Sequence, residues 1–184
     1  MDCKGFFYGT LMAPQVLYRI IGGPQNPSTT HWESSLRIRP AILHAHKRHR
    51  IKDKEYPAII AADQKSYVQG MLVEGLTEAD FWRLDIYEGS EYIRQKVRVR
   101  AMLRVVNDAQ PMTASDTLIG EDEMEAYAYV WIDEAEKLEL GEWDLAGFVR
   151  EEMQWWVGRE ATGMREGFQG RASINGTAEH KANT

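Results

Sequence analysis

A short stretch near the start of the chain, Phe6–Met12, has the residue types of an anion-binding turn. Aromatic residues run into Gly9, and Thr10 and Leu11 lead on to a helical pattern. A strand that turns sharply at a glycine into a helix points several backbone N–H groups at one spot, which suits a negatively charged group. By itself the short pattern Y-G-T-L fits an ordinary strand-to-helix turn better, in which Gly9 serves only backbone geometry.

Glu88 is the acidic residue whose position suggests chemistry. Residues 77–88 fit a compact helix that Thr77 caps and the following glycine ends. Phe81, Leu84 and Glu88 lie at i, i+3 and i+7, so a carboxylate falls on the face that otherwise packs against the core. An apolar pocket around one end of a carboxylic acid raises its pKa toward the working pH, typically by ~2 units, which favours proton transfer.

Simpler interpretations exist for the same residues. Glu88 also fits an ordinary helix-end carboxylate, solvated or paired with Arg94 or Lys96, and without further motifs that interpretation is favoured. Tyr127 and Tyr129 fit core positions better than ligand contacts, although one of them could line the mouth of a barrel.

A dense run of basic residues invites a metal-site interpretation. Its cations would repel a metal ion and no carboxylate is interleaved, so we expect no metal there and interpret the run as a solvated basic edge. The run consists of His44, His46, Lys47, Arg48, His49 and Arg50.

Length and composition narrow the function classes. The chain has 184 residues, of which 43% are hydrophobic and 27% charged, as in an ordinary globular domain. The net charge of -6 disfavours a general nucleic-acid-binding surface. A single cysteine, Cys3, excludes an internal disulfide and favours a reducing compartment. Without a membrane-spanning run or a signal-peptide pattern, the cytoplasm is the expected location, with no membrane partner.

The hydrophobic pattern predicts more strands than helices. A small mixed β-barrel or strongly curved sheet with a few covering helices, of the α+β class, fits this pattern best. We expect one domain over 1–160 and a disordered or loosely attached tail over 161–184. Expected strands cover 4–9, 36–43 (edge or bend at Pro40), 56–61, 67–73 (bulge or close backbone approach at Gly70), 91–106 and 125–132. One helix is expected to begin at Pro14, and two others to cover 77–88 and 144–159. Polar loops are expected over 24–34 and 107–123.

Several of these stretches together resemble one family. They are Tyr8–Leu11, Tyr56–Ile59, and Leu84–Gly89 with Tyr92 and Arg94, and they are similar to the gamma-glutamylcyclotransferase-like superfamily. The similarity is closest to the branch of plant avirulence-induced proteins and their fungal relatives. That branch shows a basic segment like Lys47–Lys52 and a Gly-Glu-Trp-Asp segment like Gly141–Asp144. The likeness covers roughly residues 5–157.

The resemblance implies a reaction and a site. The family releases 5-oxoproline and a free amine from γ-glutamyl compounds, so the implied partner is a small γ-glutamyl substrate and no cofactor is implied. Carried over to this sequence, the resemblance makes Glu88 the catalytic acid/base, although Tyr87 precedes it where the family usually has Phe. It assigns substrate binding to Tyr8, Gly9, Thr10, Leu11 and Tyr92.

Two other functions are open on the sequence alone. The same barrel could bind a small carboxylate ligand without turning it over, because one fold hosts unrelated functions. The loop at 107–123 and the tail could serve protein interactions. Tyr92 and Arg94 could also serve only to brace the segment that carries Glu88.

Overall fold

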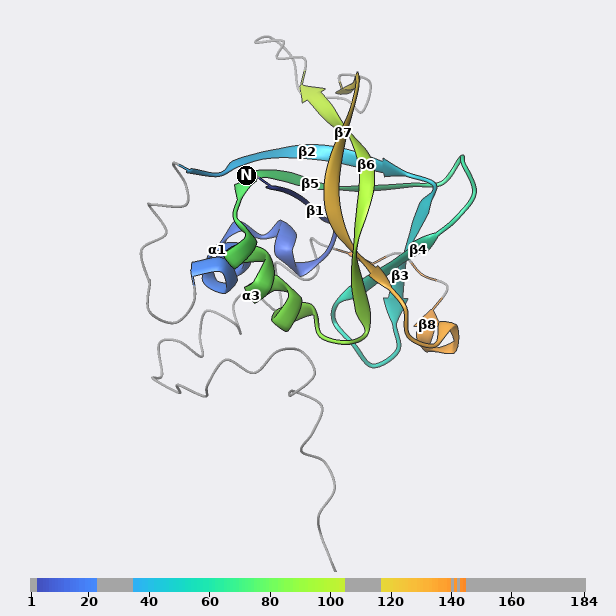
Figure 1. The fold of residues 1–184 in the computed structure, drawn as a ribbon. Helices are drawn as coiled ribbons and strands as arrows, with labels where there is room; N and C mark the ends of the chain where they lie inside the picture. Colours follow the sequence, from blue (N-terminus) through green and yellow to red (C-terminus); the bar gives the residue numbers. More distant parts are fainter. Residues whose placement is uncertain (1–2, 23–34, 105–116, 140, 142, 145–184) are drawn as a thin grey trace, which may run out of the picture.

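The strands close into a barrel. The computed structural model describes residues 3–22, 35–104, 117–139, 141 and 143–144. Within these residues the barrel order is β1 (Cys3–Phe7), β5 (Tyr67–Leu76), β2 (Arg37–His44), β6 (Tyr92–Arg104) and β7 (Thr117–Trp131), as Figure 1 shows. Neighbours pair antiparallel, except that β1 and β7 close the barrel as a parallel pair. The predicted small mixed β-barrel is confirmed.

A second, small sheet and two helices surround the barrel. The sheet has the order β4 (Pro57–Ala61), β3 (His46–Ile51) and β8 (Leu138–Glu139). Helices α1 (Pro14–Gly22) and α3 (Glu78–Glu88) lie side by side against one side of the barrel (Figure 1). Short 3₁₀ turns lie at Thr10–Met12 and Ala135–Lys137. In the described part of the chain, no helix is long and apolar enough to cross a membrane.

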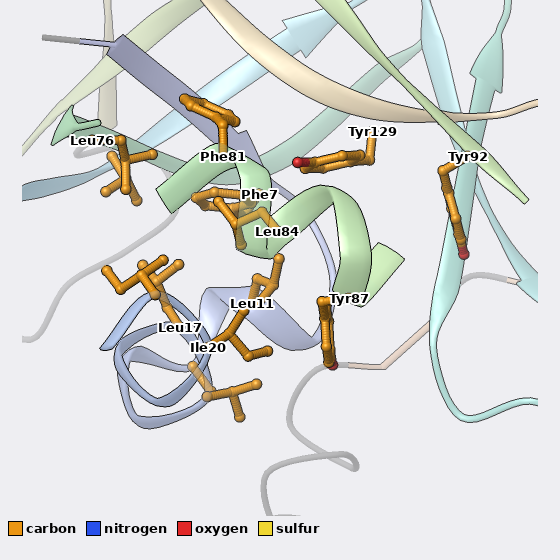
Figure 2. Packing of buried hydrophobic residues seen from close by; sticks show 14 of the residues in the cluster. Phe7, Leu11, Leu17, Ile20, Leu76, Phe81, Leu84, Tyr87, Tyr92 and Tyr129 are labelled. Atoms are coloured by element: carbon orange, nitrogen blue, oxygen red, sulfur yellow. The ribbon is translucent and has the colours of Figure 1, made fainter. Parts of the chain in front are cut away.

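The alternation of β7 separates two apolar layers. Ala126 and Ala128 face the barrel interior, where they pack with fully buried Phe6. Tyr129 and Trp131 face outward into the layer beneath the helices, part of which Figure 2 shows. This two-sided burial explains why both faces of β7 are apolar.

Helix α3 has the ends that its sequence predicts. The Thr77 side chain accepts a hydrogen bond from the Asp80 N–H at 3.2 Å, and the Asp80 carboxylate accepts one from the Thr77 N–H at 2.8 Å. Such a reciprocal cap stabilises a helix by about 1 kcal/mol. Gly89, at φ 75°, ends the helix in a conformation that disfavours a β-carbon. The cap and the glycine thus fix where Glu88 lies.

The predicted loop at 107–123 is wrong for its last part. Strand β7 begins at Thr117, and Glu123 pairs with Arg100 on β6 in the register of the ribbon. The Arg100 guanidinium also lies 3.1 Å from the Glu123 carboxylate. Cross-strand pairing with a long, strongly alternating neighbour overrides the local polar composition that predicts a loop. Residues 105–116 lie outside the described part.

Pro40 lies within the closed barrel rather than in an edge strand. It faces Met71 of β5, whereas the pairing of β2 with β6 covers only Ala41–Leu43. The missing N–H of proline therefore falls where one neighbour has already separated, which is the physical condition for a proline inside a strand.

Several expectations fall outside the described residues. They concern the loop at 24–34, the helix at 144–159 apart from Asp144, and the tail at 161–184. The single domain over 1–160 also stays a prediction.

Gly70 tests the close packing of the barrel. A β-carbon there would lie 2.4 Å from the Phe7 carbonyl oxygen and 2.7 Å from the Phe6 ring, which the backbone of β1 cannot avoid. We expect Gly70→Ala to lower the free energy of unfolding by about 1–3 kcal/mol in urea denaturation. The matched control is Gly141→Ala, whose nearest contact would be 3.4 Å to the flexible Arg50 side chain. Equal stability of both variants would contradict the packing described here.

Candidate functional site

One narrow cavity brings together the two segments that the sequence singled out. Its space is about 10 Å³, roughly enough for a single water molecule. The end of β1, the turn after it, the last residue of α3, one residue of β4 and one of β7 form its wall. The lining residues are Phe6, Phe7, Tyr8, Gly9, Thr10, Leu11, Pro57, Glu88 and Tyr129. A turn and a carboxylate some eighty residues apart in the chain thus meet.

Glu88 is held at an apolar boundary by helix α3. It is the last residue of the helix and only 5% exposed, while Phe81 and Leu84 on the same face are fully buried. Burying those two side chains stabilises the helix position by about 1.5–3 kcal/mol each. The helix therefore carries the carboxylate to the cavity as a consequence of its own packing.

The surface ion pairs considered for Glu88 are made by other carboxylates. Arg94 lies 3.5 Å from Asp85 and 3.9 Å from Glu78, and Lys96 lies 2.7 Å from Glu125. With a side chain that is almost completely buried, Glu88 is not the solvated helix-end carboxylate of the simpler interpretation.

The turn at Gly9 is shaped by Pro57. The Met12 N–H donates to the Gly9 carbonyl at 2.9 Å, which closes a single 3₁₀ turn. A β-carbon at Gly9 would lie 2.8 Å from the Pro57 ring, so only glycine lets β4 pack this closely. The Thr10 hydroxyl lies 3.3 Å from the Tyr87 hydroxyl, which joins the turn to α3 next to Glu88. The turn is therefore positioned by two separate elements.

Arg48, on strand β3, holds the start of the same turn. Its guanidinium donates to the Tyr8 carbonyl at 2.9 Å and reaches the Gln69 carbonyl of β5 at 3.4 Å. Arg48 itself is half-buried, whereas the ring of His49 is buried and lies 3.1 Å from the Glu139 carbonyl. The interpretation of this run as a solvated edge is therefore wrong for His49, because β3 is the middle strand of its sheet. Among the described residues, no three His, Cys, Asp or Glu side chains are grouped as metal ligands.

Tyr92 contacts Pro57, a residue of the cavity wall. Its hydroxyl donates to the Pro57 carbonyl at 3.0 Å, and its ring packs edge-on against Trp131 at 5.3 Å. It does not itself line the cavity. The observed contact fixes a residue of the cavity wall, and a direct contact with substrate stays a prediction.

Tyr129 lines the cavity, although the sequence favoured a core position for it and left open only that Tyr127 or Tyr129 could line a barrel mouth. It is 3% exposed, and its hydroxyl donates to the Asp85 carboxylate at 2.7 Å. Burial, the Asp85 carboxylate and the nearby Glu88 charge raise the pKa of the Tyr129 phenol far above its ordinary value. Alternation places Tyr127, Tyr129 and Trp131 on one face of β7, but it does not show which of them is level with Glu88.

A comparison with protein families matches most of the chain. The family model described as gamma-glutamyl cyclotransferase, AIG2-like, matches residues 5–145. Two Arabidopsis thaliana relatives are similar to the chain. Protein AIG2 B is 28% identical over 152 residues, which cover 83% of this chain and 73% of that protein. Protein AIG2 C is 26% identical over 139 residues, which cover 76% of this chain and 67% of that protein.

Solved structures share the fold. A solution structure of an Arabidopsis thaliana protein superposes with a TM-score of 0.52 at 22% identity, covering 86% of this chain and 88% of that chain. A structure named gamma-glutamyl cyclotransferase superposes with a TM-score of 0.50 at 13% identity, covering 94% of this chain and 95% of that one. At these identities the likeness concerns the fold alone.

The raised pKa of Tyr129 predicts a signature in alkaline unfolding. The phenol ionises in the unfolded chain above about pH 10 but stays protonated in the folded protein, so its contribution to stability is complete below that pH and is lost above it. Urea denaturation of the wild type and Tyr129→Phe across pH 7–11 should show their difference in unfolding free energy shrinking above about pH 10. The slope is at most about 1.4 kcal/mol per pH unit. A constant difference would contradict the burial of this phenol.

Proposed function

Since this chain belongs to the gamma-glutamyl cyclotransferase, AIG2-like family, we propose that it is an enzyme that releases 5-oxoproline and a free amine from a γ-glutamyl amide or peptide. The observation that carries the proposal is that Glu88, 5% exposed, lines one cavity with Gly9, Thr10 and Leu11. A buried carboxylate beside a turn whose sequence predicts anion binding suits a substrate that carries both a carboxylate and a proton to be moved.

The reaction is intramolecular: both the bond that forms and the bond that breaks belong to the substrate. The α-nitrogen attacks the γ-carbonyl carbon, which forms the five-membered lactam, and the bond from that carbon to the amide nitrogen breaks. The α-ammonium loses two protons in all and the departing nitrogen gains two. Glu88 takes one proton from the attacking nitrogen and delivers it to the leaving nitrogen, and solvent exchanges the other.

Most of the catalytic effect in this scheme comes from holding a bent substrate. Nucleophile and carbonyl already belong to one molecule, so the protein has to select the conformer in which they meet. The backbone N–H groups of the turn after Tyr8 would hold the α-carboxylate, and the two ends of the turn, braced by Arg48 and Tyr87, resist displacement. The cavity of about 10 Å³ is smaller than a γ-glutamyl group, so its walls separate when substrate enters.

A panel of γ-glutamyl substrates with detection of 5-oxoproline tests the reaction. The panel should include γ-glutamyl amino acids, γ-glutamyl alkylamines and γ-glutamyl-ε-lysine. We expect Glu88→Gln to lower kcat/KM by about 10²–10⁴, because the acid/base is lost while the side chain keeps its size. Substrate should still bind the variant in calorimetry.

Glu78→Gln is the matched control for this experiment. It makes the same substitution on the same helix, at the end remote from the cavity, and should leave kcat/KM within about twofold. Absence of 5-oxoproline with every substrate at high protein concentration would reject the enzyme. Binding of a γ-glutamyl ligand without turnover would instead favour a non-catalytic carboxylate-binding protein on this barrel.

A further inference from the structure

The hydroxyl of Tyr129 and the carboxylate of Asp85 form a pair that the proposed reaction does not yet use. We propose that this pair recognises the α-ammonium group of the substrate: the Tyr129 oxygen accepts a hydrogen bond from it, and Asp85 is the positioning residue that holds the phenol in that role. The inference rests on the proposed function, because it assigns a second anchor within the same site.

The pair of Tyr129 and Asp85 joins the cavity to helix α3. Tyr129 extends from β7 toward α3 (Figure 2), lines the cavity with Glu88 and is 3% exposed. Asp85 lies on α3, one turn before Glu88, and its Oδ1 is 2.7 Å from the Tyr129 hydroxyl oxygen. Two carboxylates of helix α3 are thus connected to the cavity: Glu88 lines it, and Asp85 is hydrogen-bonded to the Tyr129 phenol that lines it.

The direction of the hydrogen bond decides which ligand group can be bound. A phenol has one proton, and here that proton is donated to Asp85. The remaining capacity of the Tyr129 oxygen is to accept, so a further polar partner has to be a donor. An ammonium group satisfies this condition and a carboxylate does not. The raised pKa of the phenol keeps its proton in place throughout the neutral range.

Asp85 is itself fixed by its surroundings. The Arg94 guanidinium lies 3.5 Å from the same Asp85 oxygen. That guanidinium is 4.8 Å from the centre of the Phe81 ring and 5.2 Å from that of Tyr127, a cation–π arrangement that holds it in place. The ion pair and the rings keep Asp85 directed at Tyr129, since α3 and β6 both supply anchors.

Such a pair would give the nucleophile its orientation. Once solvent has taken one proton from the α-ammonium, one N–H of the resulting amine is held by Tyr129 and the other by Glu88, so the nitrogen lone pair is left to face the γ-carbonyl carbon. The α-carboxylate, bound at the turn containing Gly9, would supply the third point that fixes the chirality and the bend of the substrate.

A pair of ligands that differ only at the α-position tests the inference. They are a γ-glutamyl alkylamide and the corresponding glutaryl alkylamide, which keeps the carboxylate and amide but lacks the α-amine. Dissociation constants are measured by calorimetry in the Glu88→Gln background, where turnover is slow. Before further substitution, the protein should bind the glutamyl ligand about tenfold or more tightly than the glutaryl ligand.

Adding Tyr129→Phe should abolish most of this preference by weakening the glutamyl ligand about tenfold and leaving the glutaryl ligand nearly unchanged. Tyr67→Phe is the matched control. It removes one hydroxyl from an exposed tyrosine of β5, outside the cavity, and should leave the preference intact. The ring is retained in both variants, and thermal melting verifies that each variant folds.

Asp85 is tested by a double-mutant cycle on the same readout. Asp85→Ala should reduce the preference for the glutamyl ligand when Tyr129 is present, and should add little to Tyr129→Phe, because it acts through the phenol. Independent, additive effects of the two substitutions would overturn the positioning role.

The possible failures are distinguishable. If neither ligand binds, the proposed function fails as a whole. If both ligands bind and Tyr129→Phe weakens them equally, or weakens neither, the ammonium site is rejected while the proposed function stands.

Discussion

The packing of α3 on the outer face of the barrel is the interaction on which the site depends. Its apolar stripe, Phe81 and Leu84, is fully buried in the layer that also holds Phe7 and Tyr129. Because Glu88 continues the same stripe, the helix cannot bury its apolar face without carrying a carboxylate inward. The free energy gained by the two apolar side chains offsets the cost of bringing the carboxylate out of water.

Close packing in the barrel also positions the other part of the site, the turn at Gly9. Strand β1 approaches β5 so closely that Gly70 leaves no room for a side chain against Phe7. The same strand then ends in the turn at Gly9, which Pro57 covers and Arg48 holds. Close packing therefore fixes the backbone of the turn, which lowers the entropy cost of ordering this part of the cavity wall on binding.

Three polar contacts connect the wall of the cavity to separate elements of the fold. Tyr92 connects β6 to Pro57, Arg48 connects β3 to the turn, and Tyr129 connects β7 to Asp85 on α3. Each contact ties a cavity wall to a separate strand or helix. The wall is therefore held by several elements at once.

The sequence by itself determined the local features of the molecule. Short-range periodicity places Glu88 on the buried face of α3 and predicts the alternation of β7. Residue types with narrow backbone preferences predict the cap and the end of α3 and the close approach of the backbone at Gly70. The barrel and the family also followed, because several motifs occur in a fixed order.

Only the tertiary structure decided what pairs across long sequence separations. It extended β7 to Thr117, buried His49 and bonded the half-buried Arg48 to the Tyr8 carbonyl in place of a solvated edge, and placed Tyr129 in the same cavity wall as Glu88. Strand register and barrel closure set these relations. They depend on contacts between residues far apart in the chain, which the periodicity of any single segment does not encode.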